Sequence, residues 1–491
     1  MSMIEIQNLT FGYDGVYSNV FENINLRLDT SWKLGLVGKN GSGKTTLLKL
    51  LYGDHRYSGH IYCLKQFEYF PYPIAYTSGQ LTMDVINSIM PDIETWRIKR
   101  EITLLELDEN VLWQPYNTLS GGQQTKLMIA LLFLKENHFL LLDEPTIHLD
   151  MYARDILAKY LNKKEGFILV SHDRTVLDNC TDHTLSIQNS GLYLTHGNFS
   201  VYWQNYKNQE LFEIKQNQKL QKDIDRLTIA SRRTSTWSDK LEKTKKGQDQ
   251  PVDRGYIGHK SAKLQKRAKS IEKNVQNAIK QKAELLKDTQ QNYKLKLNPI
   301  LVKDNILIQI KDLTILYNDK PANKKLSLEI KAGDKIALCG KNGCGKSSIL
   351  KLINGQKIDY CGTFYKKNGI LISYVSQDTH GIYGSYENFA INEGIDLTQF
   401  LTILRKLGFR REQFEYPIES LSAGQKKKVM ISKSLCQRAH LYIWDEPLSF
   451  VDLDCRLQLI DLINEYNPTL LLVEHDRSFC NAITTNLVYM D

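Results

Sequence analysis

Two short glycine-rich segments have the spacing G-x-x-x-x-G-K-[S/T], which is typical of turns that bind phosphate groups. Glycines in such a turn let backbone N–H groups close around phosphates at the start of a helix. Lys44 and Lys346 are therefore expected at the β- and γ-phosphates, with Thr45 and Ser347 on Mg²⁺. The first turn consists of Gly38, Lys39, Asn40, Gly41, Ser42, Gly43, Lys44, Thr45 and Thr46, and the second of Gly340, Lys341, Asn342, Gly343, Cys344, Gly345, Lys346, Ser347 and Ser348.

Two pairs of adjacent acids follow short apolar runs of the sequence. The first acid of each pair, Asp143 or Asp445, stands at the end of an expected strand, where a carboxylate can hold Mg²⁺ through water. The second, Glu144 or Glu446, is a candidate for polarising the water that attacks the terminal phosphate. An ordinary strand-end acid is the alternative interpretation, and the glycine-rich turn upstream of each pair argues against it.

A histidine follows shortly after another apolar run in each half of the chain. His172 and His475 are candidates for contacting the γ-phosphate, beside the acid that polarises the water. A single histidine in such a position is more often structural. Because both histidines occupy the same place relative to the other motifs, we favour the functional interpretation.

These motifs recur in one order at a nearly constant offset, which predicts a duplicated domain. The glycine-rich turn, the acidic pair and a segment Leu119-Ser-Gly-Gly-Gln123 recur after 302 residues, and the His-Asp-Arg segment recurs after 303. Short apolar runs alternate with helical patterns in each copy, as in mixed α/β domains. We place the first copy in residues 1–204, a linker in residues 205–303 and the second copy in residues 304–491.

The linker is basic and has a helical pattern. Residues 205–300 hold 23 Lys and Arg against 11 Asp and Glu, a balance of +12 in a chain whose total is +9. The rest of the chain therefore carries −3, so the basic character is confined to an element suited to a polyanion. Two narrow apolar stripes predict two packed helices, and helix breakers within residues 234–259 predict the tip of an antiparallel hairpin between them. A solvated spacer is the alternative, but a flexible spacer does not need apolar stripes.

Other features of the sequence exclude several classes of protein. The N-terminal residues lack the basic start and apolar stretch of a signal peptide. No apolar run approaches the roughly 18 residues that span a bilayer. The eight cysteines form no Cys-x-x-Cys pair, which favours buried thiols in a reducing compartment. We therefore expect a cytoplasmic protein with no membrane segment.

The segment Leu119-Ser-Gly-Gly-Gln123 recurs in the second copy as Leu421-Ser-Ala-Gly-Gln425. Together with the turns and the acidic pairs, these two segments resemble the motifs of ABC ATPases, in which such a segment is called the signature. The resemblance implies an α/β fold with two tandem ABC-type (P-loop) nucleotide-binding domains, joined by an α-helical hairpin, and the cofactors ATP and Mg²⁺. It also implies a monomer whose two domains pair head to tail. Each ATP would then lie between one glycine-rich turn and the signature of the other copy: residues 38–46 facing Ser422, Ala423, Gly424 and Gln425, and residues 340–348 facing Ser120, Gly121, Gly122 and Gln123.

The same resemblance implies unequal sites. Tyr13 and Tyr317 match the aromatic residue that stacks on adenine, although an isolated tyrosine is usually part of a core. Gln377 matches the glutamine that ligates Mg²⁺ and senses the γ-phosphate, whereas Tyr72 stands at that place in the first copy. The signature that would complete the first site also has Ala423 in place of glycine. We therefore expect the site that uses Lys44 to hydrolyse ATP more slowly than the site that uses Lys346.

Two complete copies with a basic hairpin between them resemble the F-type ABC proteins that act on ribosomes. The chain is similar to the members that protect ribosomes against lincosamides, streptogramin A and pleuromutilins (the Lsa type). This implies the 70S ribosome as partner, with 23S rRNA at the exit site and the peptidyl-site tRNA. It also implies that the tip of the hairpin displaces a drug. The residues expected to do so are Trp237, Tyr256, Ile257, Lys266 and Arg267, and packing within the loop is an equal alternative for them. A housekeeping factor that relieves stalled ribosomes, or the ATPase subunit of an exporter, are the other functions considered.

Overall fold

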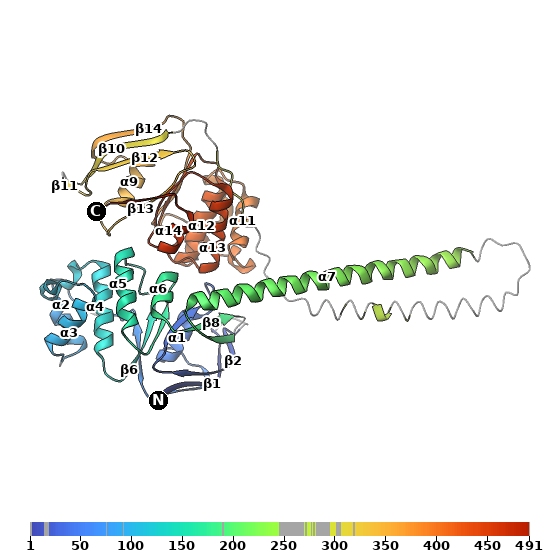
Figure 1. Cartoon of the computed structure of the whole chain (residues 1–491), viewed down its shortest axis with the longest axis horizontal. Helices are drawn as coiled ribbons and strands as arrows, with labels where there is room; N and C mark the ends of the chain where they lie inside the picture. The colour runs from blue at the N-terminus through green and yellow to red at the C-terminus, as the bar shows by residue number, and fades with distance from the viewer. Residues whose placement is uncertain are drawn as a thin grey trace, which may run out of the picture. The chain divides into compact units, whose positions relative to one another are not determined.

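The computed structural model describes residues 2–13, 19–74, 76–91, 93–188, 191–244, 270, 273–275, 277, 280, 295–300, 306–317 and 320–490, without the side chains of residues 230–244. These residues form two compact units. One unit consists of Met1–Tyr202 and Tyr293–Asp491 and holds both copies of the repeat, and the other consists of Trp203–Asn292. Figure 1 shows the elements of both.

The first copy contains a six-stranded sheet in the order β5-β6-β7-β3-β8-β9, parallel except for β9. Its strands are short apolar runs, as expected for parallel strands covered on both faces. A smaller antiparallel sheet has the order β2-β1-β4. The strands are β1 (Met3–Phe11), β2 (Phe21–Asp29), β3 (Lys33–Val37), β4 (Ser58–Cys63), β5 (Gln66–Phe70), β6 (His138–Asp143), β7 (Phe167–Val170), β8 (His183–Gln188) and β9 (Gly191–His196).

Helix α1 packs its leucines into the core that the two sheets of this copy share. The helices of the first copy are α1 (Lys44–Tyr52), α2 (Thr82–Ile89), α3 (Thr95–Leu104), α4 (Gly121–Leu134), α5 (Met151–Asn162) and α6 (Arg174–Cys180), with short 3₁₀ turns η1 (Glu109–Trp113) and η2 (Tyr116–Thr118).

The second copy repeats this plan with a five-stranded parallel sheet in the order β15-β16-β17-β13-β18. Strand β10 pairs antiparallel with three short strands. The elements are β10 (Ile306–Tyr317), β11 (Lys320–Pro321), β12 (Leu326–Lys331), β13 (Lys335–Cys339), α9 (Lys346–Ile353), β14 (Tyr360–Lys366), β15 (Ile372–Val375), α10 (Tyr386–Asn392), α11 (Leu397–Lys406), η3 (Arg411–Phe414), η4 (Ile418–Ser420), α12 (Ala423–Cys436), β16 (Leu441–Asp445), α13 (Leu453–Tyr466), β17 (Leu470–Val473), α14 (Arg477–Ile483) and β18 (Asn486–Tyr489).

The two tandem α/β domains that the motifs predict are confirmed. Strands β6, β7 and β3 are neighbours in the first sheet, and β16, β17 and β13 are neighbours in the second. Because the strands are parallel, their carboxyl ends meet at one edge of the sheet. The acidic pair, the histidine and the glycine-rich turn of each copy follow these ends, so the fold gathers the candidate residues at that edge.

The linker begins with the long helix α7 (Phe199–Thr244). A break from residue 234 was expected, and this limit is wrong because the helix continues through Thr244; the first glycine comes only at residue 247. Ser270, Lys273–Val275, Asn277 and Lys280 are also helical, and the predicted tip lies outside the described residues. Trp237 lies in α7, and its side chain, like the whole of Tyr256, Ile257, Lys266 and Arg267, is outside the described part.

Residues just before the second copy already pack against it. Leu295 and Leu297 are buried in the hydrophobic core of that copy, and the backbone N–H of Ile300 donates to the carbonyl of Ala439 at 2.9 Å. The domain limits at residues 204 and 304 stay predictions. Within the described residues, no helix combines the length and apolar character needed to cross a membrane.

Candidate functional site

The first glycine-rich turn connects β3 to α1 in a conformation that only glycine adopts readily. Gly43, directly before α1, has φ of 100°, and a Cβ there would lie 2.7 Å from a methyl group of Val20. The Nζ atom of Lys44 donates to the carbonyl oxygens of Gly38 at 2.8 Å and Lys39 at 3.1 Å. The ammonium group therefore folds back over the turn, where the phosphates are expected.

The second turn has the same geometry. Gly345 precedes α9 with φ of 84°, and Lys346 Nζ donates to the carbonyl oxygens of Gly340 and Lys341, both at 2.8 Å. A Cβ on Gly340 would lie 2.3 Å from the carbonyl oxygen of Met490, so the turn also depends on glycine for close packing.

The two candidate adenine-stacking tyrosines are held by equivalent hydrogen bonds. The hydroxyl of Tyr13 lies 2.8 Å from Thr46 Oγ1, and that of Tyr317 lies 2.8 Å from Ser348 Oγ. Their side chains are about half exposed, at 44% and 52%. Each ring is thus fixed at one end beside a turn and retains an open surface on which a base can stack.

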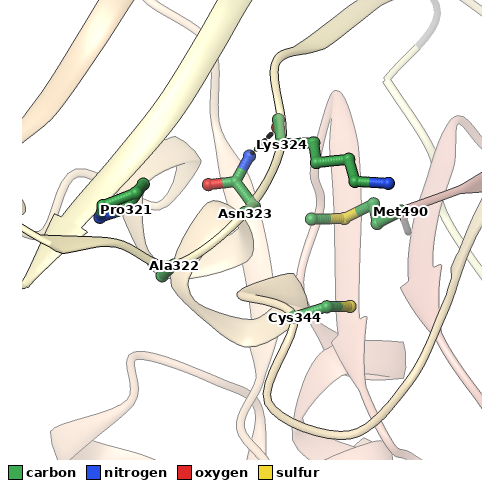
Figure 2. A pocket seen from close by; sticks show the side chains of 6 residues that line it. All are labelled: Pro321, Ala322, Asn323, Lys324, Cys344 and Met490. Carbon is green, nitrogen blue, oxygen red and sulfur yellow. Dashed lines mark hydrogen bonds between the residues drawn. The ribbon is translucent and has the colours of Figure 1, made fainter.

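A cavity of about 300 Å³ adjoins the second turn at Cys344 (Figure 2). Its wall mixes apolar side chains with one amide and one amine; it is lined by Pro321, Ala322, Asn323, Lys324, Cys344 and Met490. Asn323 is fixed by its side-chain amide, which donates to the carbonyls of Leu313 and Lys324. We expect part of the bound nucleotide beside this wall.

The acidic pair of the second copy lies in a dense polar network. Ser347 Oγ donates to Asp445 Oδ1 at 3.1 Å, and Gln377 Nε2 donates to Glu446 Oε1 at 2.9 Å. His475 Nε2 lies 3.5 Å from the same Glu446 oxygen. Burial alone would raise the pKa of Glu446, but the hydrogen bonds from His475 and Gln377 outweigh it and lower the pKa to about 2. This glutamate is therefore ionised at neutral pH.

The acidic pair of the first copy is less well supported. His172 Nε2 lies 3.3 Å from Glu144 Oε1, but this oxygen is buried and no described residue gives it a hydrogen bond of regular geometry. Burial raises the pKa of Glu144 to about 7; the positive charge of Lys44 opposes the rise and the negative charge of Asp143 adds to it. Burial and the charge of Lys44 hold the pKa of His172 well below its usual value.

The difference between the copies follows from the residues at the glutamine position. Gln377 contacts Glu446, whereas the ring of Tyr72 lies beneath the ammonium group of Lys135 at 5.2 Å. In the first copy, Asp143 Oδ2 accepts a hydrogen bond from the hydroxyl of Tyr69 at 2.9 Å, and Tyr374 lies beside Asp445 at the matching place of the second copy.

Both signature segments cap a helix. Ser120 caps α4 and Ser422 caps α12, and each is joined to the glutamine three residues later by reciprocal hydrogen bonds. This capping box fixes the first turn of the helix and directs its free N–H groups toward any anion at that end. The second glycine of the signature is needed for packing, because a Cβ on Gly424 would lie 2.4 Å from the carbonyl oxygen of Phe450.

The structure brings each glycine-rich turn against the other copy. Asn40 Nδ2 donates to the carbonyl of Phe450 at 2.8 Å, and a Cβ on Gly424 would lie 3.2 Å from the same Asn40 nitrogen. In the second contact, Asn342 donates to the carbonyl of His148 at 3.2 Å and to Asp150 Oδ2 at 3.3 Å. The two copies therefore face each other with turns against signature ends, as the resemblance implies, and the binding of ATP by these residues stays a prediction.

Magnesium fits the residues present at the second site. Asp445 keeps one buried carboxylate oxygen, Oδ2, without a regular hydrogen bond from the described residues, and burial raises the pKa of this carboxyl to about 6. A buried carboxylate of this kind gains from a nearby cation, and carboxylate and hydroxyl oxygens are ligands that Mg²⁺ prefers. Asp445, Ser347 and Gln377 would hold the ion at the second site, and Thr45 and Asp143 at the first.

Sequence reasoning missed two features of the site. The segment after the second acidic pair contacts the opposite turn through the carbonyl of Phe450, and only the constant offset between the copies suggested that this segment matters. Lys427, in the helix after the second signature, contacts the backbone of Gln377 and Asp445. The difference between the copies at this position, Lys427 against Thr125, was the sign in the sequence that could have indicated it.

Comparison with known proteins places both copies in one family. The family model described as ABC transporter matches residues 21–147 and 323–449, together just over half of the chain. The chain is 28% identical to the ribosome protection protein VmlR of Bacillus subtilis (strain 168), over 99% of this chain and 86% of that protein. It is 27% identical to the ATP-binding protein Uup of Buchnera aphidicola (subsp. Acyrthosiphon pisum, strain APS), over 98% of this chain and 79% of that protein.

Solved structures show the same fold. A crystal structure of archaeal ribosome recycling factor aABCE1 with the archaeal ribosomal stalk protein aP1 has a TM-score of 0.62 at 17% identity, covering 98% of this chain and 87% of that chain. An archaeal ABCE1 in a model of the ribosome-bound complex with Pelota has a TM-score of 0.61 at 19% identity, covering 98% of this chain and 76% of that chain. With two copies of the family domain in tandem, each carrying a phosphate-binding turn and an acidic pair, the chain belongs to the ABC transporter family and is an ATPase.

Proposed function

We propose that this ATPase is a ribosome protection protein of the cytoplasm, which binds the exit site of the 70S ribosome and displaces antibiotics from the peptidyl-transferase centre. The drugs proposed are lincosamides, streptogramin A and pleuromutilins. Its contacts would be with 23S rRNA and the peptidyl-site tRNA. The similarity to a ribosome protection protein over 99% of this chain supports the assignment.

The structural observation that carries the proposal is the path from the first nucleotide site to the start of the linker. Asp173, next to the candidate His172, caps α6 by accepting a hydrogen bond from Val176 N at 3.1 Å. At the other end of α6, the carboxylate of Asp178 accepts hydrogen bonds from Ser200 N and Ser200 Oγ, both at 2.6 Å. A shift of α6 on ATP binding or release would therefore move the first turn of α7.

The interface between the copies places α6 where such a shift would arise. Arg154 Nη1 donates to Asp173 at 3.0 Å, and the equivalent Arg456 Nη1 donates to Asp476 at 2.7 Å, directly before α14. Helices α6 and α14 contact each other across the interface between the copies, and burial, followed by the negative charge of Asp476, raises the pKa of Asp173. Closure and opening of this interface by ATP binding and hydrolysis would be passed to the linker through α6.

The charge of the linker indicates its target. Its excess of 12 positive charges within residues 205–300 is suited to the phosphates of rRNA and tRNA, which would make binding depend strongly on salt. When bound, Mg²⁺ would offset the charge that develops on the phosphates. Lys44 and Lys346 would bind the phosphates, and Glu144 and Glu446 would orient the attacking water.

Drug susceptibility tests the proposal. A sensitive bacterial host would express the wild-type chain or the double variant Glu144→Gln, Glu446→Gln, and would be exposed to clindamycin, a pleuromutilin, a streptogramin A and a macrolide. We expect only the wild type to raise tolerance, and only to the first three drugs. A housekeeping role in translation, the second candidate in view of the comparable identity to Uup, predicts unchanged tolerance and arrest of growth by the double variant.

A further inference from the structure

Lys427 is a fully buried cation that the proposed chemistry does not yet use. It lies in α12, five residues after the capping Ser422, and its side chain is 1% exposed. Its Nζ atom donates to the carbonyl oxygens of Ser376 at 2.8 Å, Gln377 at 3.0 Å and Asp445 at 3.3 Å. An ammonium group has three N–H donors, so each has an acceptor, which is the condition for burying a charge at tolerable cost.

The three acceptors belong to two elements that carry candidate residues of the Lys346 site. Ser376 and Gln377 follow β15, and Asp445 ends β16. In front of the lysine, the side chain of Gln377 donates to Glu446 at 2.9 Å. The ammonium group therefore links the backbone of Gln377 to that of Asp445. The side chains of Gln377 and Glu446 meet at the site.

Negative charges lie around Lys427, and two of them belong to the site. Burial lowers the pKa of Lys427, and the charges of Asp445, Glu446 and Glu474 oppose this effect. Removal of the ammonium group would leave the carbonyl oxygens of Ser376, Gln377 and Asp445 without their shared donor.

The first copy has no such group at the equivalent position. Thr125 stands there, buried at 7% exposure, and its short neutral side chain carries no charge. This is also the copy in which Tyr72 lies near Lys135 and in which Glu144 has the raised pKa. The lysine and the glutamine–glutamate contact thus occur in the same copy.

We propose that Lys427 is a positioning residue of the Lys346 site, which fixes Gln377 and the acidic pair by binding the backbone carbonyl oxygens of Ser376, Gln377 and Asp445. The inference rests on the proposed roles of Gln377, Asp445 and Glu446 in hydrolysis. Lys427 lies in α12, whose signature end faces the Lys44 site. If the lysine only stabilised this helix, its loss would disturb the signature and slow the Lys44 site. If it positions Gln377 and the acidic pair, its loss would slow the Lys346 site.

The test uses the full chain with one hydrolytic site left active at a time. Lys427→Met is introduced beside Glu144→Gln, which leaves the Lys346 site, and beside Glu446→Gln, which leaves the Lys44 site. In the first background we expect kcat to fall about 10- to 100-fold, as for a misplaced catalytic group. KM for ATP should change less than about threefold, because ATP contacts are retained. In the second background the rate should stay within about twofold of its parent.

The split between kcat and KM, and between the two sites, is a readout that a purely structural role would not give. Equal losses at both sites, or an unchanged rate at the Lys346 site, would overturn the inference.

A parallel measurement separates this inference from the proposed roles. If Gln377→Ala and Glu446→Gln each slow hydrolysis while Lys427→Met does not, the roles hold and the inference about Lys427 is wrong. If Gln377→Ala and Glu446→Gln leave hydrolysis unchanged, the roles themselves fail. Thermal unfolding of each variant identifies any that does not fold, and Lys427→Thr, which takes the residue of the first copy, then replaces Lys427→Met.

Discussion

Gln377 Nε2 lies 2.9 Å from Glu446 Oε1, and this contact has no counterpart at Glu144 among the described residues, where Tyr72 contacts Lys135 instead. The two sites therefore differ at the residue that would orient the attacking water. In one, the glutamate is ionised and held by an amide; in the other, it is buried with a pKa of about 7. The duplicated fold thus contains two nucleotide sites of different quality.

The first prediction concerns the rates of the two sites. Glu144→Gln should retain most of the wild-type ATPase rate, whereas Glu446→Gln should lose about tenfold, because the better-ordered glutamate is removed. Steady-state hydrolysis at saturating ATP and Mg²⁺ measures both. Equal losses would show that the contact between Gln377 and Glu446 does not set the rate.

The second prediction concerns the dependence of stability on pH in the absence of nucleotide. The pKa of Glu144 rises from 4.5 to about 7 on folding, so Glu144 lowers stability as pH rises through this range. Glu144→Gln should therefore stabilise the protein at pH 8, by on the order of 1–3 kcal/mol, and have little effect near pH 5.

Glu446 provides the matched comparison for stability. Its pKa falls from 4.5 to about 2 on folding, so it contributes stability that is fully present above pH 4.5 and is lost as pH falls through 2. Glu446→Gln should lower the unfolding temperature at pH 8, the opposite of Glu144→Gln. Thermal unfolding at two pH values measures both shifts, and shifts of the same sign would contradict the assigned environments.

The third prediction concerns the signature glycines. Gly424→Ala would place a Cβ 2.4 Å from the carbonyl of Phe450, which also accepts the hydrogen bond from Asn40. In the Glu446→Gln background, where the Lys44 site remains, we expect at least about a tenfold loss of rate, because this contact must shift. ATPase assays of the purified variants measure the loss.

Gly121→Ala is the control for the signature. A Cβ at Gly121 meets the His148 side chain at an ordinary 3.5 Å, and the equivalent position of the second copy already holds Ala423. Measured in the Glu144→Gln background, it should slow the Lys346 site much less than Gly424→Ala slows the Lys44 site, because it meets no backbone atom at close range. A large loss for Gly121→Ala, or none for Gly424→Ala, would show that this spacing does not control the sites.

Much of the fold could be predicted from the sequence because the motifs are local. The apolar run before each glycine-rich turn forms the expected strand, at residues 33–37 and 335–339, and a helix follows each turn, as the motif predicts. The alternation of apolar runs and the spacing of glycines determine these elements without reference to distant residues.

The details that separate the two sites depend on tertiary packing. The direction of Tyr72 toward Lys135 and the three acceptors of Lys427 come from segments that lie dozens of residues apart in sequence. No periodicity reports such contacts. The limit of α7 was also missed, because residues 234–244 are polar and contain no helix breaker, so their composition is compatible with either a loop or a helix.

ATP-dependent binding to ribosomes is the property on which the proposed function depends. The double variant Glu144→Gln, Glu446→Gln should bind ATP without hydrolysing it and keep the two copies closed. It would be sedimented with purified 70S ribosomes in ATP or in ADP, at low and high salt. We expect retention on ribosomes with ATP, little with ADP, and loss of binding as salt rises. Absence of ribosome binding in ATP at low salt, with nucleotide binding intact, would contradict the proposed function.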